Sequence, residues 1–251
     1  MYNLILMYNK YYIFTIIILI IIISIYLFIK YQEKFDNKIL PNIYYINLEH
    51  RLDRKKNFIS EFKQIDYPIN KLIRINAVKH NIGTLGCLQS HILALKTALN
   101  ETNNIEFVII CEDDFIFRKR DNNKHSDYFY SLLENNFKDW NVILLSFTGK
   151  PKKKYKNIKL NDFKPKNFRY IWNSHQTAGY LIKKSYIPIL LDFWEKLYDK
   201  TKDYKETPSF EEHIDVAWWE LQDNKWFSYK KKIGTQLPSY SDIEKSIKSY
   251  R

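Results

Sequence analysis

The sequence is poor in cysteine and lacks the patterns by which cysteine usually binds metals or forms disulfide frameworks. Its two cysteines, Cys87 and Cys111, make no CxxC pair. Both lie among apolar residues, so buried free thiols are the expected state, and one bridge in an oxidising compartment is also compatible with the sequence. The chain has no helix-turn-helix pattern, no zinc-finger pattern and no internal repeat. These absences argue against the common small DNA-binding and metal-binding modules.

Charge and apolar content bound the class of protein further. The formal net charge is +12, which suits an anionic partner such as a nucleotide, a nucleic acid or a membrane surface. The lysines are scattered, apart from a dense block at residues 150–159 that we interpret as a solvated loop. Without a DNA-binding motif, we predict no nucleic-acid partner. Hydrophobic residues make up 45% of the chain and aromatic residues 17%, which indicates a packed globule rather than a disordered chain.

The longest uncharged stretch lies near the amino terminus. Residues 11–29 read YYIFTIIILIIIISIYLFI and would span roughly 28 Å as a helix, close to the thickness of a bilayer core. This stretch has no small-x-small site of the kind that ends a cleaved signal peptide. We therefore expect residues 1–30 to form the transmembrane anchor of a single-pass membrane protein, followed by a linker over residues 31–38. The flanking lysines leave open the side of the membrane on which the domain lies.

Strands alternate with helices in the remaining residues, 39–251, which we expect to form one domain. The expected strands are residues 42–48, 72–78, 107–111, 142–145 and 178–182. The expected helices are residues 53–62, 88–99 and 128–137, and a further one runs through Trp194. This alternation predicts an α/β domain with three layers and a mostly parallel central sheet. In open sheets of this kind, ligands bind beyond the carboxyl ends of the strands.

Three consecutive carboxylates, Glu112, Asp113 and Asp114, follow the apolar run at residues 107–111. Ionised carboxylates are rarely buried without a partner, so these acids form either a solvated turn or a site for something cationic. Hard cations such as Mn²⁺ or Mg²⁺ accept few protein oxygens and complete their shell with water and phosphate oxygens. A cation held there would neutralise a diphosphate that leaves a nucleotide-activated donor.

Four segments, in this order, resemble glycosyltransferase family 25, which includes lipopolysaccharide-type sugar transferases and collagen galactosyltransferases. The segments are YYINLEHRLDR (residues 44–54), GCLQSH (86–91), ICEDDF (110–115) and TQLPSYSDIE (235–244), with weaker matches at TAGYLI (177–182) and HIDVAWW (213–219). The resemblance covers nearly all of the chain from Asn42 to Glu244. It implies a GT-A-like fold, a UDP-sugar donor, Mn²⁺ and inversion at the anomeric carbon.

The resemblance also implies roles for individual residues. Glu112 and Asp114 match the acid-x-acid pair of the family, with Asp114 as the metal ligand and Glu112 as a second candidate ligand. Either Glu112 or Asp113 would hold the ribose or the sugar of the donor, and His213 is a candidate late metal ligand. An inverting transfer is a single displacement that needs a general base opposite the leaving diphosphate, and Asp215 is the candidate.

A second set of residues suits the nucleotide. Asn47 ends a predicted strand, and Arg51 and Arg54 lie in the following turn, where they can meet a base and phosphates. The same arginines would equally serve as caps or surface ion pairs of the next helix. Trp218 and Trp219 likewise suit either a sugar face or the core.

The expected function is that of a membrane-anchored, metal-dependent, inverting glycosyltransferase. It would move a hexose, most simply galactose or glucose, from a UDP-sugar to a hydroxyl group of a glycan or a protein. The alternative is a non-catalytic protein on the same fold that binds a nucleotide or a glycan. A two-metal phosphoesterase would need a second acidic cluster, which the sequence lacks, and the family resemblance disfavours a glycosidase. The sequence does not reveal the acceptor or the oligomeric state.

Overall fold

The structure is a computed structural model that describes residues 15–27, 40–101, 105–118, 125–134, 138–149, 167–222, 225–241 and 246–248. The chain divides into two compact units, Met1–Leu40 and Pro41–Arg251. The second unit contains every strand of the described residues. The predicted linker at residues 31–38 and the basic block at residues 150–159 lie outside the described residues.

The prediction of a transmembrane anchor over residues 1–30 is contradicted. The described helix in this segment covers residues 15–27 and spans about 20 Å at ~1.5 Å per residue. A bilayer core is about 30 Å thick and needs about 20 consecutive apolar residues in one helix. Among the described residues, no helix combines the length and the apolar character needed to cross a membrane. The expectations of a single-pass membrane protein and of membrane localisation therefore do not hold.

A seven-stranded sheet with the order β2-β1-β3-β7-β5-β8-β6 lies at the centre of the second unit. Its strands are β1 (Ile43–Asn47), β2 (Leu72–Asn76), β3 (Phe107–Glu112), β5 (Val142–Leu144), β6 (Phe168–Tyr170), β7 (Gly179–Lys183) and β8 (Trp226–Tyr229). The pairs β1–β2, β1–β3 and β5–β8 are parallel, whereas β3–β7, β5–β7 and β6–β8 are antiparallel. The α/β class is confirmed, but the prediction of a mostly parallel sheet is wrong, because β7 lies between β3 and β5 and runs antiparallel to both.

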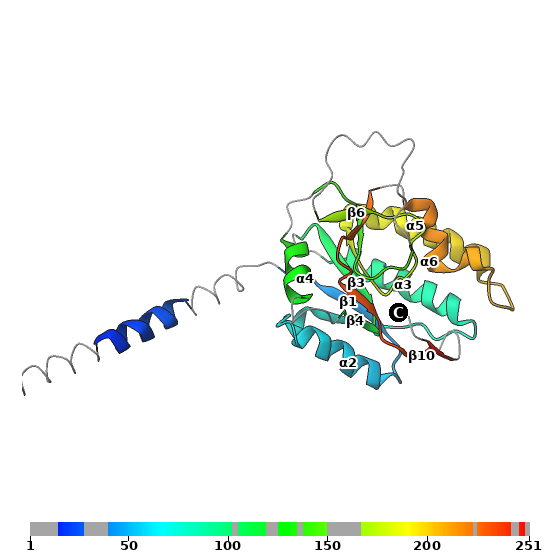
Figure 1. The fold of residues 1–251 in the computed structure, drawn as a ribbon. Coiled ribbons are helices and arrows are strands. Elements are labelled where there is room, and N and C mark those ends of the chain that lie inside the picture. The colour runs from blue at the N-terminus through cyan, green and yellow to red at the C-terminus, as the bar shows by residue number, and fades with distance from the viewer. Residues whose placement is uncertain are drawn as a thin grey trace, which may run out of the picture. The chain divides into compact units, whose positions relative to one another are not determined.

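Helices pack on this sheet, as Figure 1 shows. They are α2 (Leu52–Lys63), α3 (Gly83–Leu99), α4 (His125–Leu133), α5 (Ile187–Thr201) and α6 (Ile214–Ala217), with short 3-10 helices η1 (Ile69–Lys71), η2 (Lys184–Tyr186), η3 (Phe210–Glu212) and η4 (Trp218–Leu221). Two small sheets complete the unit, formed by β4 (Phe115–Phe117) with β9 (Gly234–Gln236) and by β10 (Ser239–Ser241) with β11 (Ser246–Lys248). α3 packs against β1, β2, β3, α5 and α6, whereas α2 contacts β4.

Strand β1 explains why both faces of the sheet are covered. Tyr44 and Ile46 belong to the large core that also contains Leu88 of α3. The alternate residue, Tyr45, stacks on Phe58 of α2 with ring centroids 4.6 Å apart. Successive side chains of a strand point to opposite faces, so α3 and α2 cover opposite sides of β1. Every residue of β1 is buried, as the continuous apolar sequence predicts for a central strand.

Candidate functional site

The acidic segment begins where β1 and β3 end. Ile46 of β1 is paired with Glu112 of β3, and the backbone N–H of Asp113 donates to the carbonyl oxygen of Ile46 at 3.0 Å. On the other side, the N–H of Glu112 donates to the carbonyl oxygen of Ala178 at 2.9 Å, directly before β7. Backbone hydrogen bonds from both neighbouring strands therefore hold the acids at this edge of the sheet.

Phe115, which follows the acids, fixes the direction of the turn. Its side chain is fully buried, with Phe62 and Phe117 at centroid distances of 6.2 and 5.3 Å. A Cβ atom on Gly179 would lie 2.7 Å from the Phe115 ring, and one on Gly234 would lie 2.1 Å from it. Both positions therefore require glycine, because any side chain would push the ring and the acidic turn away.

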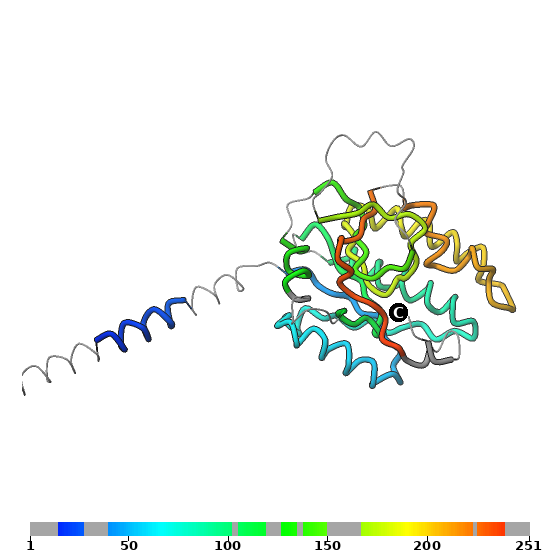
Figure 2. Tube along the Cα trace, viewed as in Figure 1, coloured from blue at the N-terminus to red at the C-terminus, as the bar shows by residue number. Residues whose placement is uncertain are grey.

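A late segment of the chain also holds the turn. The backbone N–H of Leu237 donates to the carbonyl oxygen of Asp114 at 2.7 Å, and β9 pairs antiparallel with β4. The tube in Figure 2 shows this segment in orange to red as it crosses the domain. Asp114 is thus held by residues that lie far from it in the sequence.

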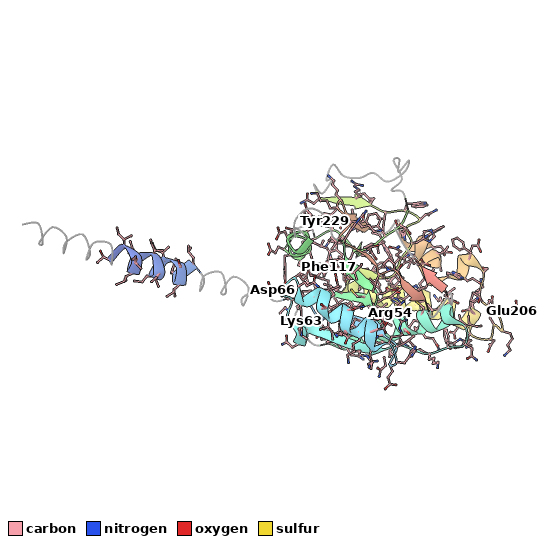
Figure 3. All side chains as sticks on the ribbon, turned by 60° about the horizontal axis from the view of Figure 1, so that its bottom comes forward. Arg54, Lys63, Asp66, Phe117, Glu206 and Tyr229 are labelled. Atoms are coloured by element: carbon pink, nitrogen blue, oxygen red, sulfur yellow. The ribbon has the colours of Figure 1, made fainter. Side chains whose placement is uncertain are left out.

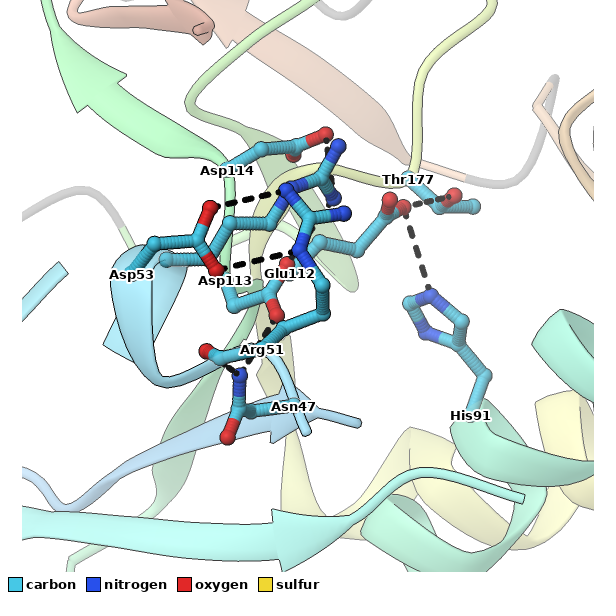
Figure 4. Close-up of polar contacts among 9 residues, drawn as sticks. Asn47, Arg51, Asp53, His91, Glu112, Asp113, Asp114 and Thr177 are labelled. Carbon is cyan, nitrogen blue, oxygen red and sulfur yellow. Dashed lines mark hydrogen bonds and ion pairs between the residues drawn. The ribbon is translucent and has the colours of Figure 1, made fainter. Parts of the chain in front are cut away.

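Asp113 and Asp114 share the guanidinium group of Arg54. Figure 4 shows both carboxylates together with Asn47, Arg51 and Glu112. Nη1 of Arg54 lies 3.1 Å from Oδ1 of Asp113 and 3.3 Å from Oδ2 of Asp114. Nδ2 of Asn47 donates to Oδ2 of Asp113 at 2.7 Å, and Oδ1 of Asn47 accepts from Nε of Arg74 at 2.9 Å. Two residues predicted to meet a nucleotide, Asn47 and Arg54, therefore also hold the carboxylates in position.

Arg51 pairs with Asp53 at the start of α2. Nε and Nη2 of Arg51 lie 3.1 and 3.0 Å from the two carboxylate oxygens of Asp53, which holds the pKa of that carboxyl down at about 2. The backbone oxygen of Arg51 accepts from Nδ2 of Asn47 at 3.0 Å. Arg54 and Lys63 mark the two ends of α2 in Figure 3. Both predicted arginines thus lie at the end of α2 that meets the acids.

Glu112 contacts a different set of groups, on the side of α3 and β7. Its Oε1 accepts a hydrogen bond of 2.6 Å from the hydroxyl of Thr177 and lies 3.5 Å from Nε2 of His91. His91 is fully buried, and its Nδ1 lies 3.2 Å from the hydroxyl of Tyr180. Burial alone would raise the pKa of Glu112. The contact with His91, the hydrogen bond from Thr177 and the charge of Arg54 together outweigh burial, so the net pKa is lowered.

Asp114 is the least compensated of the three carboxylates. Burial and the charge of Glu112 raise its pKa from 3.8 to about 8, against the opposing charge of Arg54. Its Oδ1 is buried and has no hydrogen-bond partner among the described residues. Three carboxylates thus face one guanidinium group, and one of their oxygens is unpartnered. This oxygen-rich, negatively charged set fits a hard divalent cation such as Mn²⁺ or Mg²⁺.

A second group of possible metal ligands overlaps this set. Among the described residues, Cys87, His91 and Glu112 have ligand atoms that all lie within 4.8 Å of one another. This group includes Glu112 but neither Asp114 nor His213. His213 directly precedes α6, with its ring 6.0 Å from that of Phe210. The role of His213 as a metal ligand stays a prediction.

The loop at residues 171–178, between β6 and β7, links Glu112 to Asp215. Thr177 donates to Glu112, and the backbone N–H of the preceding residue, Gln176, donates to Oδ2 of Asp215 at 3.2 Å. Nδ1 of His175 lies 3.9 Å from the same oxygen. The predicted base therefore lies against the same loop that contacts the predicted metal-binding acids.

The pKa of the Cys87 thiol is affected by the charges of these acids. Burial raises its pKa well above 9.0, and the charges of Glu112, Asp215 and Asp114 raise it further. Of these carboxylates, that of Glu112 lies within 4.8 Å of the Cys87 thiol.

Buried side chains hold the same loop in place at Ser174. The carbonyl oxygen of Ser174 accepts from Nε1 of Trp218 at 3.1 Å, from Nε1 of Trp219 at 3.2 Å and from Nε2 of Gln222 at 2.8 Å. Oε1 of Gln222 accepts from the backbone N–H of Ser174 at 2.9 Å. Trp218 is fully buried, so its ring belongs to the core rather than to a sugar-binding surface.

The structure brings together most of the predicted site residues, namely Asn47, Arg54, Glu112, Asp113 and Asp114, and it places Asp215 across the loop. Sequence reasoning did not find Arg74, His175 or Gln176. Arg74 reaches Asn47 from the neighbouring strand, and no local pattern reports such a contact. His175 and Gln176 immediately precede the TAGYLI segment, and this proximity was the available signal.

An α/β domain that gathers carboxylates at the carboxyl ends of parallel strands defines a ligand-binding class of protein, typical of enzymes that handle nucleotides. A sequence profile described as "Glycosyltransferase family 25 (LPS biosynthesis protein)" matches residues 69–205, more than half of the chain. The chain therefore belongs to glycosyltransferase family 25. Comparison with curated proteins finds no match.

Solved structures similar to this chain include three glycosyltransferases. One is "a glycosyltransferase involved in the glycosylation of the major capsid of PBCV-1", with 7% identity, a TM-score of 0.48 and coverage of 82% of this chain and 97% of that chain. GlyE of Streptococcus pneumoniae TIGR4 has 9% identity, a TM-score of 0.39 and coverage of 76% and 45%. The galactosyltransferase LgtC, solved with donor and acceptor sugar analogs, has 10% identity, a TM-score of 0.39 and coverage of 74% and 72%. At these values, the family assignment rests on the sequence match.

Proposed function

We propose that this family 25 member transfers a hexose, galactose or glucose, from a UDP-sugar to a hydroxyl group of a glycan or a protein, with inversion at the anomeric carbon. The observation that carries the proposal is Asp114, a buried carboxylate beside two other acids, with a raised pKa and with one oxygen that has no partner in the described part of the chain. A site of this charge suits a divalent cation together with a diphosphate.

Mn²⁺, or Mg²⁺ in its place, is the proposed cofactor. Asp114 and Glu112 would hold it, with His213 as a further ligand. Bound there, the cation would supply positive charge to the diphosphate of the donor. The hydrogen bond from Thr177 and the contact with His91 keep Glu112 ionised, and an ionised carboxylate is the form that binds a metal.

The nucleotide would lie next to the end of β1. Asp113 is held rigidly by Asn47 and Arg54, so its carboxylate is a preorganised acceptor for a ribose hydroxyl. Arg51, at the start of α2, would face the phosphates, because guanidinium groups bind phosphate oxygens in pairs. These groups orient the donor and take no part in bond making.

Asp215 would act as the general base. Its side chain is 31% exposed, so an acceptor hydroxyl can reach it. The hydroxyl proton would pass to the Asp215 carboxylate while the hydroxyl oxygen bonds to the anomeric carbon. The bond from that carbon to the diphosphate oxygen breaks in the same displacement, and UDP leaves. The N–H of Gln176 keeps Oδ2 of Asp215 in position during this transfer.

The test is UDP release by the full chain across a panel of UDP-sugars, with Mn²⁺ or with a chelator, in the presence of mono- and disaccharide acceptors. We expect metal-dependent release that Asp114→Asn abolishes and that Asp215→Asn lowers by about 100- to 10,000-fold while UDP still binds. Asp192→Asn, on the exposed face of α5, is the matched control and should behave as wild type. UDP binding by the wild type without release from any donor would instead support a non-catalytic binding protein.

A further inference from the structure

Gln176 is a buried amide whose polar atoms have no partner. Its residue surface is 5% exposed, and neither Oε1 nor Nε2 makes a hydrogen bond within the described part of the chain. Buried polar groups in native proteins are almost always hydrogen-bonded, and an orphaned amide destabilises the fold. An orphaned amide next to a candidate active site is available to bind a ligand.

The backbone conformation of Gln176 is also energetically unfavourable. Its φ is +80°, in the left-handed region that residues with a Cβ atom rarely adopt. Such strained residues persist where the surrounding structure enforces them, and they cluster at sites that bind ligands. Here the enforcing contacts are the bond from its N–H to Asp215 and the bond from Thr177 to Glu112.

The position of Gln176 follows from those two bonds. One connects its backbone to the proposed base, and the other connects the next residue to the proposed metal-binding acids. In an inverting displacement the transferred sugar lies between the base and the leaving diphosphate. Gln176 therefore lies beside the space that the hexose itself would occupy, rather than beside the nucleotide.

Ser146 provides a second unpartnered group on the adjoining segment. Its hydroxyl is fully buried and has no partner among the described residues. The N–H of Ser146 contacts the carbonyl oxygen of Gly179 at 3.4 Å, and Thr148 bridges to His175, so the segment after β5 runs alongside the loop before β7. Two neighbouring segments thus present polar groups without partners, as a sugar with several hydroxyls requires.

We propose that the side-chain amide of Gln176 binds a hydroxyl of the donor hexose and thereby selects the sugar. This inference rests on the proposed function. A primary amide donates through Nε2 and accepts through Oε1, and a hydroxyl group can do both in return. An epimer whose hydroxyl points elsewhere would leave the amide unpartnered again, and sites built on buried hydrogen bonds reject such analogues strongly.

Gln176→Gly is the decisive variant, because glycine removes the amide and also suits a φ of +80°. Gln176→Glu keeps the shape and replaces the amide donor with an acceptor. Asp66→Gly is the matched control, since Asp66 also has a positive φ of 57° but is exposed at the far end of α2 from Arg54 (Figure 3). Each full-length variant would be measured for stability, for UDP and UDP-hexose affinity with Mn²⁺, and for kcat/KM with UDP-galactose and UDP-glucose.

We expect Gln176→Gly to be at least as stable as wild type and to bind UDP unchanged. Its affinity for the preferred UDP-hexose should fall about 10-fold or more, and its preference between the two hexoses should shrink towards one. Gln176→Glu should also lose the preference, whereas Asp66→Gly should keep it.

Two outcomes would overturn the inference, and they separate it from the proposed function. If wild type transfers a hexose and Gln176→Gly keeps the same affinity and preference, the amide is no sugar ligand and the proposed function stands. If wild type binds no UDP-hexose more tightly than UDP and releases UDP from no donor, the proposed function fails and the inference fails with it.

Discussion

Nη1 of Arg54 lies 3.3 Å from Oδ2 of Asp114, and the same nitrogen lies 3.1 Å from Oδ1 of Asp113. One positive group thus serves two carboxylates, while Glu112 adds a third negative charge. The pKa of Asp114 rises to about 8 as a result of burial and of these charges. Without a cation, the stability of the protein should therefore depend on pH in a defined direction.

We expect the metal-free chain to lose stability as the pH rises from 5 to 8. Folded Asp114 keeps its proton up to about pH 8, whereas the ordinary pKa of 3.8 applies once the chain unfolds. The folded state binds more protons in this window, so the free energy of unfolding falls with pH, by at most about 1.4 kcal/mol per unit. Urea unfolding in chelator at each pH would measure it. Asp114→Asn should remove most of the fall and exceed wild-type stability at pH 8, with a smaller part left to Asp113, whose pKa burial also raises. A flat wild-type profile would contradict this.

Gln222→Leu should destabilise the fold by about 1–3 kcal/mol, because the buried N–H of Ser174 loses its acceptor. The leucine side chain is similar in size, so the loss reports the hydrogen bonds rather than a cavity. The midpoint of urea unfolding is the measurement. Gln64→Leu, at an exposed position of the same residue type, should change stability by less than about 0.5 kcal/mol. Equal effects of the two substitutions would refute the role of Gln222.

Thr177→Val should weaken the proposed reaction through Glu112. The hydroxyl of Thr177 helps to lower the pKa of Glu112, so its removal raises that pKa and moves the acid limb of the kcat/KM profile to higher pH. Thr177→Ser keeps the hydroxyl and should retain the wild-type profile. The measurement is UDP release against pH. A Thr177→Val profile that coincides with wild type would show that this hydrogen bond does not matter for activity.

Both cysteine thiols should react slowly in the folded protein. Burial raises the pKa of Cys87 and of Cys111 well above 9.0, so little thiolate exists at pH 8, and the thiolate is the reactive form. With Ellman's reagent we expect both thiols to react at once in denaturant and at less than about a tenth of that rate in the native protein. A fast native phase would contradict this expectation and would point to Cys87, the less buried of the two residues.

The elements of the fold could be predicted well where the apolar pattern is unambiguous. The run at residues 107–111 predicts a strand buried on both faces, and β3 is such a strand. The direction of β7 could not be predicted, because a continuous apolar run has the same pattern whichever way the strand lies in the sheet. The prediction of a membrane anchor rested on a count of apolar residues over 11–29, and such a count does not give the length of the described helix, residues 15–27.

The candidate site also has a part that the sequence predicts and a part that it does not. Glu112, Asp113 and Asp114 follow a strand, so their place at the edge of the sheet follows from the chain itself. The surroundings of Gln176 do not, because its contacts come from α6 and its strained φ is not marked by a glycine in the sequence. A contact between residues that lie far apart in the chain leaves no pattern in the sequence around either residue.

The bond between Leu237 and Asp114 has a consequence for synthesis. A chain that leaves the ribosome amino end first can form β1, β2 and β3 early. The backbone partner of Asp114 and the strand that covers Phe115 emerge only after residue 233, and pairings over such separations in sequence form slowly. The geometry of the acidic segment would therefore be completed in one late step of synthesis. A nascent chain interrupted before β9 would carry all three acids but would lack the contacts that hold them in place.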